Sequence, residues 1–102
     1  MAEFMRKGRF PAPVDRSAVA ADWAGRGFSC DLFVDPPGRA WVDFVHDSNE
    51  LVTVTEGRLE ITVNGTRALA DPGDEVFIAR GHRHSVRNVA PVPTRWLYGY
   101  DD

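Results

Sequence analysis

Short runs in which apolar and polar residues alternate fill most of the chain after residue 27. In "ELVTVTE", for example, Glu50, Val52 and Val54 fall on one face of an extended strand, and Leu51 and Thr53 on the other. Turn-forming residues separate the runs, and an Asn-Gly pair, the strongest short hairpin signal, stands after the fourth. The pattern predicts eight strands over residues 28–34, 40–46, 50–56, 59–63, 66–70, 75–79, 84–89 and 94–100. Such even spacing is typical of an antiparallel β-sandwich or barrel.

The first 27 residues have a different pattern. Two prolines and several charges before residue 15 indicate an arm, and "SAVAADWA" then predicts a short helix over residues 17–24. Val19 and Trp23 are four residues apart and would share its apolar face. The helix has candidate boundaries at both ends, with Asp15 or Ser17 as the N-cap and Gly25 and Gly27 as the stop. We therefore expect an arm and helix over residues 1–27 and a barrel over residues 28–102.

Three polar residues interrupt the predicted interior. If the valine-rich faces line the inside, then His46, Glu50 and His84 point inward near strand ends. The same alternation places Val42 and Phe44 on the face of His46. Charged groups are rarely buried without a partner, so two imidazoles and a carboxylate suggest a bound ligand. Periodicity leaves open whether the three converge, and a single His-x3-Glu is also common in an ordinary capped turn.

Two spaced motifs resemble those of the cupin family. The first consists of Gly38, five residues, "FVH", three residues, Glu50, six residues and Gly57. The second consists of Gly73, five residues, "ARG", two residues, His84, three residues and Asn88. Both spacings match without a gap, and together the motifs cover about half of the chain. The resemblance implies an all-β antiparallel cupin β-barrel (a double-stranded β-helix or jelly roll) with a short N-terminal helix or arm.

The resemblance also implies one divalent transition metal inside the barrel, held by His46, Glu50 and His84. Imidazole and carboxylate ligands suit Fe, Mn, Ni or Zn. The chain departs from the family pattern at two positions: Phe44 stands where the family has its first histidine ligand, and Ala79 where it has a proline. Two histidines and one carboxylate with open positions suit a non-heme iron site competent for O2 chemistry. The alternative is a weakened site that binds a small molecule with little or no metal.

From the three implied metal ligands we expect a metal-dependent enzyme that acts on a small molecule, of the oxygenase type (dioxygenase-like). An isomerase or lyase of the same fold, or a non-catalytic binding or sensing module, remains an alternative. The substrate pocket is expected to include Phe44, His82, Trp96 and Tyr98. For His82 a solvated loop position is the simpler alternative, and for Trp41, Trp96, Tyr98 and Tyr100 the alternative is plain core packing. By analogy with other small members of the family, we also expect a homodimer.

Composition narrows the function classes. With 102 residues, 43% of them hydrophobic and 26% charged, the chain suits one globular domain. A net charge of −3 argues against general nucleic-acid binding, which requires a basic face. No apolar run is long enough to span a membrane, and the N-terminus has no apolar segment of a secretory signal. The single cysteine, Cys30, suits a reducing compartment, so we expect a cytoplasmic location.

Overall fold

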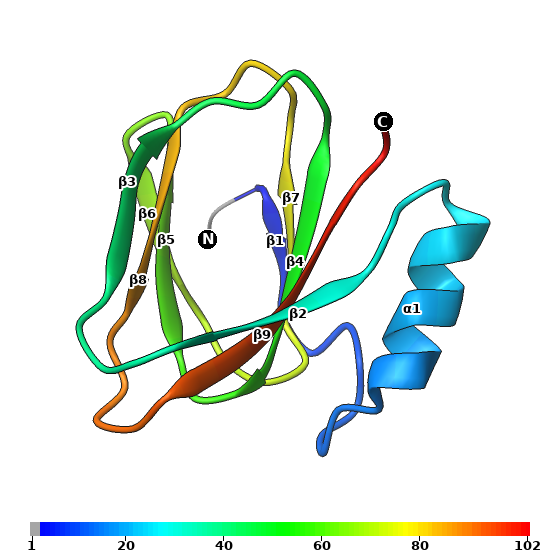
Figure 1. The fold of residues 1–102 in the computed structure, drawn as a ribbon, viewed down its shortest axis with the longest axis horizontal. Helices are drawn as coiled ribbons and strands as arrows, with labels where there is room; N and C mark the ends of the chain where they lie inside the picture. Colours follow the sequence, from blue (N-terminus) through cyan, green and yellow to red (C-terminus); the bar gives the residue numbers. More distant parts are fainter. Residues whose placement is uncertain (1–2) are drawn as a thin grey trace.

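The computed structural model describes residues 3–102 and contains nine strands and one helix in that range. Two antiparallel sheets face each other (Figure 1). The five-stranded sheet has the order β1-β7-β4-β9-β2, and the four-stranded sheet the order β3-β8-β5-β6. The elements are β1 (Met5–Arg6), α1 (Arg16–Gly25), β2 (Asp31–Asp35), β3 (Ala40–Phe44), β4 (Glu50–Glu56), β5 (Leu59–Val63), β6 (Thr66–Ala70), β7 (Glu75–Ile78), β8 (His84–Asn88) and β9 (Thr94–Tyr100). The predicted all-β barrel is confirmed, and each predicted run overlaps a strand.

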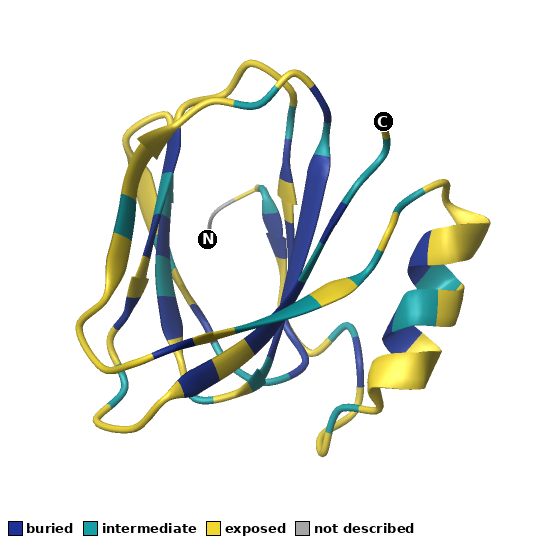
Figure 2. Ribbon diagram, in the orientation of Figure 1, coloured by how far each residue is buried: buried dark blue, intermediate teal, exposed yellow. Residues whose placement is uncertain are grey.

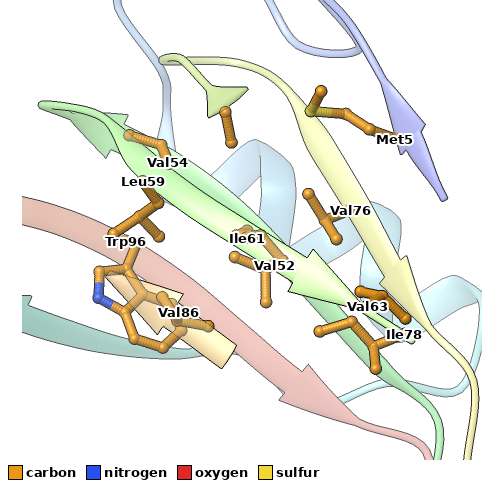
Figure 3. Close-up of a cluster of buried hydrophobic side chains, with 11 residues drawn as sticks. Met5, Val52, Val54, Leu59, Ile61, Val63, Val76, Ile78, Val86 and Trp96 are labelled. Atoms are coloured by element: carbon orange, nitrogen blue, oxygen red, sulfur yellow. The ribbon is translucent and has the colours of Figure 1, made fainter. Parts of the chain in front are cut away.

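The main core lies between the two sheets. Val52 and Val54 of β4 point inward and are fully buried, opposite Ile61 of β5 and Val86 of β8 (Figure 3). The predicted alternation of β4 is confirmed, because Leu51 lies on the other face, in a second cluster against the helix. Burying apolar faces of both sheets against each other is what stabilises a sandwich of this size.

Helix α1 covers the outer face of the five-stranded sheet (Figure 1). It begins after Asp15, whose side chain accepts a hydrogen bond from the Ser17 amide at 2.9 Å, as expected of an N-cap. Val19 and Trp23 are fully buried against the sheet, and Figure 2 shows the opposite side of the helix exposed. The Trp23 indole N–H donates to Glu75 at 2.9 Å, which fixes the helix on β7. Within residues 3–102 this ten-residue helix is the only one, and a membrane-spanning helix needs a longer apolar stretch.

The N-terminal arm holds a strand that the sequence did not predict. Met5 and Arg6 pair with Val76 and Glu75, so β1 extends the five-stranded sheet beyond β7. Met5 is buried in the main core. A strand of two residues is too short to show a period-2 pattern. The sequence therefore contains no signal for it, and the composition of the segment indicates an arm.

Strand β3 contains a bulge that changes which of its residues face inward. Trp41 pairs with Val86 and Phe44 pairs with His84, so two residues on β3 oppose one on β8. Asp43 has a φ of 58°, and its amide donates to the Ser85 hydroxyl at 3.0 Å. The expectation that Val42 shares the face of Phe44 is therefore wrong: Val42 is 61% exposed, and Trp41 faces inward instead.

Asn88 and Gly57 lie at the end of the barrel where β4 ends, opposite the end where β4 begins with Glu50. The Asn88 amide donates to the carbonyls of Asp35 and Val92, and its oxygen accepts from the Thr94 hydroxyl at 2.7 Å. Gly57 has a φ of 98° and lies against Thr94, so that a Cβ atom would overlap the Thr94 side chain. Gly57 connects β4 to β5, which lie in different sheets, so this turn is not a β-hairpin. The positive φ and the close approach to Thr94 are two separate requirements for glycine at this position.

Candidate metal centre

The structure brings His46, Glu50 and His84 together. One potential ligand atom from each lies within 4.8 Å of the other two. Glu50 is the first residue of β4, His84 is the first of β8, and His46 lies in the loop that follows β3. The backbone N–H of Gly81 donates to the His46 carbonyl at 2.9 Å, which joins the loops before β4 and β8. Three strand ends thus meet at one site.

The Glu50 carboxylate is buried, and one of its two oxygens lacks a hydrogen bond within residues 3–102. Its Oε1 atom has no hydrogen-bond partner in the part of the chain that the structure describes. The Nε2 atoms of His84 and His46 lie 3.5 and 3.7 Å away. Burial raises the pKa of Glu50 to about 7. A buried oxygen without a partner requires an explanation, and a cation between these three side chains would supply one. The donor set therefore fits a divalent metal.

His84 is oriented for this role by a backbone group. Its Nδ1 lies 3.2 Å from the His82 carbonyl, and because a carbonyl only accepts, Nδ1 carries the hydrogen. The other nitrogen, Nε2, then presents its lone pair toward Glu50. Burial lowers the pKa of His84, and neighbouring His46 lowers it further, while the His82 carbonyl acts in the opposite direction. Net lowering favours the neutral imidazole that metals bind.

His46 lies next to two aromatic rings. The Tyr100 hydroxyl lies 3.4 Å from Nε2 of His46, and the two rings meet edge to face. The Phe44 ring is nearly parallel to the His46 ring, with ring centroids 6.2 Å apart and an interplanar angle of 11°. Burial, and secondarily the nearby charge of Glu50, raises the pKa of Tyr100 to about 12, so that its phenol keeps the proton at neutral pH.

The three polar residues line a cavity of about 240 Å³ whose other walls are mainly aromatic. Two of these walls, Trp41 and Trp96, donate their indole N–H groups to the buried carboxylate of Asp35, at 3.2 and 2.9 Å. Their polar atoms are thus satisfied outside the cavity, and the rings are held in place. The complete lining is Phe33, Trp41, Phe44, His46, Glu50, His84, Val86, Trp96, Tyr98 and Tyr100.

Three of the four predicted pocket residues line the cavity, and the fourth does not. Phe44, Trp96 and Tyr98 line the cavity, and Phe44 is 39% exposed at its opening. His82 does not line it: its side chain lines a separate hollow beside Phe4 and other residues. This corrects the expectation for His82. The residue lies in the turn before β8, where its amide donates to the Ala79 carbonyl, and only its own carbonyl reaches the site.

Four lining residues stood outside the predicted site: Phe33, Val86, and also Trp41 and Tyr100, for which the sequence left both pocket lining and core packing open. A usable signal exists for Tyr100, which shares a face of β9 with Trp96 and Tyr98 at period 2. Val86 follows His84 at the same period on β8. Trp41 had no such signal, because the bulge at Asp43 changes the alternation.

Comparisons with known proteins agree with this geometry. A model of the cupin domain family matches residues 31–100. Tetracenomycin polyketide synthase protein TcmJ from Streptomyces glaucescens is 30% identical over 63 residues, which are 61% of this chain and 42% of that protein. The matched part of this chain thus corresponds to less than half of that relative.

Solved structures share the fold. The TT1209 protein from Thermus thermophilus superposes with a TM-score of 0.65 at 29% identity, over 72% of this chain and 71% of that one. A cupin 2 domain-containing protein from Halorhodospira halophila superposes with a TM-score of 0.68 at 23% identity, over 74% of this chain and 53% of that one. An oxalate oxidase superposes with a TM-score of 0.68 at 21% identity, over 81% of this chain and 47% of that one. At this identity the likeness shows the fold alone. With its matching family model, its two facing sheets and its inward histidines and glutamate, the chain belongs to the cupin family.

Proposed function

We propose that this protein is a metal-dependent enzyme of the oxygenase type that acts on a small, flat molecule. One observation supports the proposal above all others. The Oε1 atom of Glu50 lies 3.5 and 3.7 Å from two imidazole nitrogens in a mainly aromatic cavity, and it has no hydrogen bond to any residue that the structure describes. His46, Glu50 and His84 would hold one divalent Fe, Mn, Ni or Zn ion. Such a metal, when bound by three side chains, supplies open positions where a substrate and O2 can bind.

The chain's own residues would prepare the site. The His82 carbonyl holds His84 with Nε2 toward the cavity. The side chains of Glu50 and His84 are buried, while that of His46 is partly exposed. Phe44 occupies the position of the family's first histidine and offers no ligand atom, so a metal would keep an open coordination position. Tyr100 holds its proton at the phenol oxygen beside His46.

Cavity size and chemistry favour a substrate of about one ring. A cavity of roughly 150 Å³ lined by apolar side chains accommodates benzene, and the present one is about 240 Å³. Aromatic walls bind flat rings by stacking and edge contacts. The likeness to a protein named for a polyketide synthase, at 30% identity, supports small-molecule metabolism as the setting.

Metal content tests the proposal. Protein purified without chelator or added metal is expected to hold near one equivalent of a transition metal by elemental analysis. His46→Ala and Glu50→Gln should reduce that content at least tenfold. His82→Ala is the matched control, because it removes a histidine that lies two residues before His84 and outside the cavity. This variant should retain the metal. Wild-type protein without metal would contradict the proposal.

Oxygen consumption tests the reaction type. Metal-loaded protein is to be screened with small diols, thiols and keto acids while dissolved O2 is recorded. Uptake that disappears in Glu50→Gln would support an oxygenase. Substrate conversion without uptake would replace that assignment with an isomerase or lyase. Tight binding without conversion would replace it with a non-catalytic binding module.

A further inference from the structure

Tyr100 stands beside the ligand cluster without belonging to it. Its hydroxyl lies 3.4 Å from Nε2 of His46, the nitrogen that also lies 3.7 Å from the Glu50 carboxylate. The backbone fixes this placement, because Tyr100 pairs directly with Glu50 across β9 and β4. The Tyr100 ring also packs edge to face on His46 at 5.1 Å. The hydroxyl is therefore held at the site by the same ladder that holds the carboxylate.

Hydroxyl groups are few among the residues that line the cavity. Of the ten residues that line the cavity, only Tyr98 and Tyr100 carry hydroxyl groups. The indole N–H groups of Trp41 and Trp96 are both used by Asp35. Between the two tyrosines, the Tyr100 hydroxyl is the one with a contact to a residue of the cluster. Phe44, at the position of the missing histidine, provides neither a ligand nor a donor.

We propose that Tyr100 is a ligand-binding residue that donates a hydrogen bond to an anionic oxygen of the substrate. The inference rests on the proposed function, since it requires a metal at His46, Glu50 and His84. A metal on His46 would occupy the lone pair of Nε2, and the phenol would then be free to donate to another oxygen. A divalent ion and one carboxylate leave a net charge of +1, which suits a singly charged oxygen.

The substrate class follows from the two parts of the cavity. Its aromatic walls suit a planar ring, and its polar side suits an oxygen anion attached to that ring. The structure thus favours a one-ring carboxylate, phenolate or enolate. Benzoate serves as the probe, because it has a ring, one negative charge and oxygen atoms that accept hydrogen bonds. Imidazole serves as the comparison, because it binds metals through nitrogen and has no oxygen to receive the phenol proton.

The experiment uses Co(II)-loaded full-length protein and follows the visible absorption of the cobalt during titration. Wild type, Tyr100→Phe and Tyr98→Phe are first titrated with Co(II), and all three should bind it equally. Benzoate should then bind Tyr100→Phe about tenfold more weakly than wild type, the effect of a lost hydrogen bond to a charged group. Imidazole should bind all three proteins within twofold. Tyr98→Phe removes the other hydroxyl group of the cavity, and it should weaken benzoate binding by less than Tyr100→Phe does.

The possible results distinguish the role of Tyr100 from the existence of the metal site. If wild-type protein fails to bind Co(II), both the metal site and the role of Tyr100 are overturned. If wild type binds Co(II) but Tyr100→Phe retains benzoate affinity, only the role of Tyr100 is overturned. Equal weakening of benzoate and imidazole, or equal weakening in Tyr98→Phe, would show a general change of cavity shape and would also overturn it. Equal melting temperatures of the three proteins confirm that the variants are folded.

Discussion

The Glu50 carboxylate lies 3.5 Å from Nε2 of His84, yet its Oε1 atom forms no hydrogen bond within the described residues. Burial lowers the pKa of His84, so the imidazole carries no charge at neutral pH to offset the carboxylate. The pair is therefore neither a salt bridge nor a hydrogen bond, and in metal-free protein it destabilises the fold. A site kept at this cost is typical of function rather than of stability.

Glu50→Gln should stabilise the metal-free protein at alkaline pH. The pKa of Glu50 is raised from 4.5 to about 7 in the folded state, so the folded protein holds its proton more tightly than the unfolded chain. The free energy of unfolding of the wild type therefore falls as pH rises from 4.5 to 7. Above pH 7 the full destabilisation by the ionised Glu50 is present. The variant should gain about 2 to 3 kcal/mol at pH 8. Urea denaturation with chelator present measures it.

The same comparison at pH 4.5 provides the control. There the carboxyl is largely protonated in the folded protein, so that most of the difference between variant and wild type should vanish. A gain of the same size at both pH values would mean that packing, and not charge, causes it.

Phe44→His should raise the affinity for a divalent metal. The Phe44 ring lies 6.2 Å from the His46 ring and 6.4 Å from the His84 ring, which places a side chain at this position beside both proposed ligands. A fourth ligand of the family's usual type should tighten Zn(II) binding at least tenfold, about 1.4 kcal/mol. Competition titration with a chelating dye measures the affinity.

Phe44→Leu is the control for this substitution, since it removes the ring without adding a ligand. Its Zn(II) affinity should stay near that of wild type. An unchanged affinity in Phe44→His would show that position 44 does not reach the metal.

Asp35→Ala should destabilise the protein by on the order of 3 kcal/mol, because it leaves two buried indole N–H groups without an acceptor. Both Trp41 and Trp96 donate to this carboxylate, which is fully buried. Urea denaturation followed by far-UV circular dichroism measures the change. Asp31→Ala removes an exposed carboxylate of the same strand and should change stability by less than about 0.5 kcal/mol. Equal effects would rule out a special role for Asp35.

Gly57→Ala should destabilise far more than Gly65→Ala. Both glycines have positive φ, 98° and 83°, so both variants incur backbone strain of about 1 kcal/mol. Only at Gly57 would the added Cβ overlap Thr94, while Gly65 has open space around it. We expect a loss of several kcal/mol for Gly57→Ala, or failure to fold. Thermal denaturation of the pair compares them directly, and similar melting temperatures would contradict the assigned contact.

The strands were predictable because the turn residues and the period-2 pattern agree along the chain. Val52 and Val54, for example, face the core as alternation predicts. The bulge in β3 was not predictable, because it depends on a positive φ at Asp43, a residue type that also suits a regular turn or strand end. That bulge places Trp41 in the cavity and Val42 in solvent. Long-range packing, which alternation does not encode, determines the rest of the cavity.

For the site, the spacing of the motifs carried most of the information. It identified the three residues that the structure brings together, His46, Glu50 and His84. It gave no information on Asp35, which accepts hydrogen bonds from Trp41, six residues away, and from Trp96, 61 residues away. It also misplaced His82, which lines a separate hollow. The homodimer, the cytoplasmic location and the identity of the metal stay predictions. Size-exclusion chromatography with light scattering tests the first.

The placement of the tryptophans gives the protein an internal optical reporter. Trp41 and Trp96 form cavity walls and share one carboxylate, while the third tryptophan, Trp23, is buried under α1 on the far side of the five-stranded sheet. A ring that enters the cavity would quench or shift the emission of the first two and leave the third as an unchanged reference. A search for the natural substrate can therefore begin with the intrinsic fluorescence of the unlabelled protein.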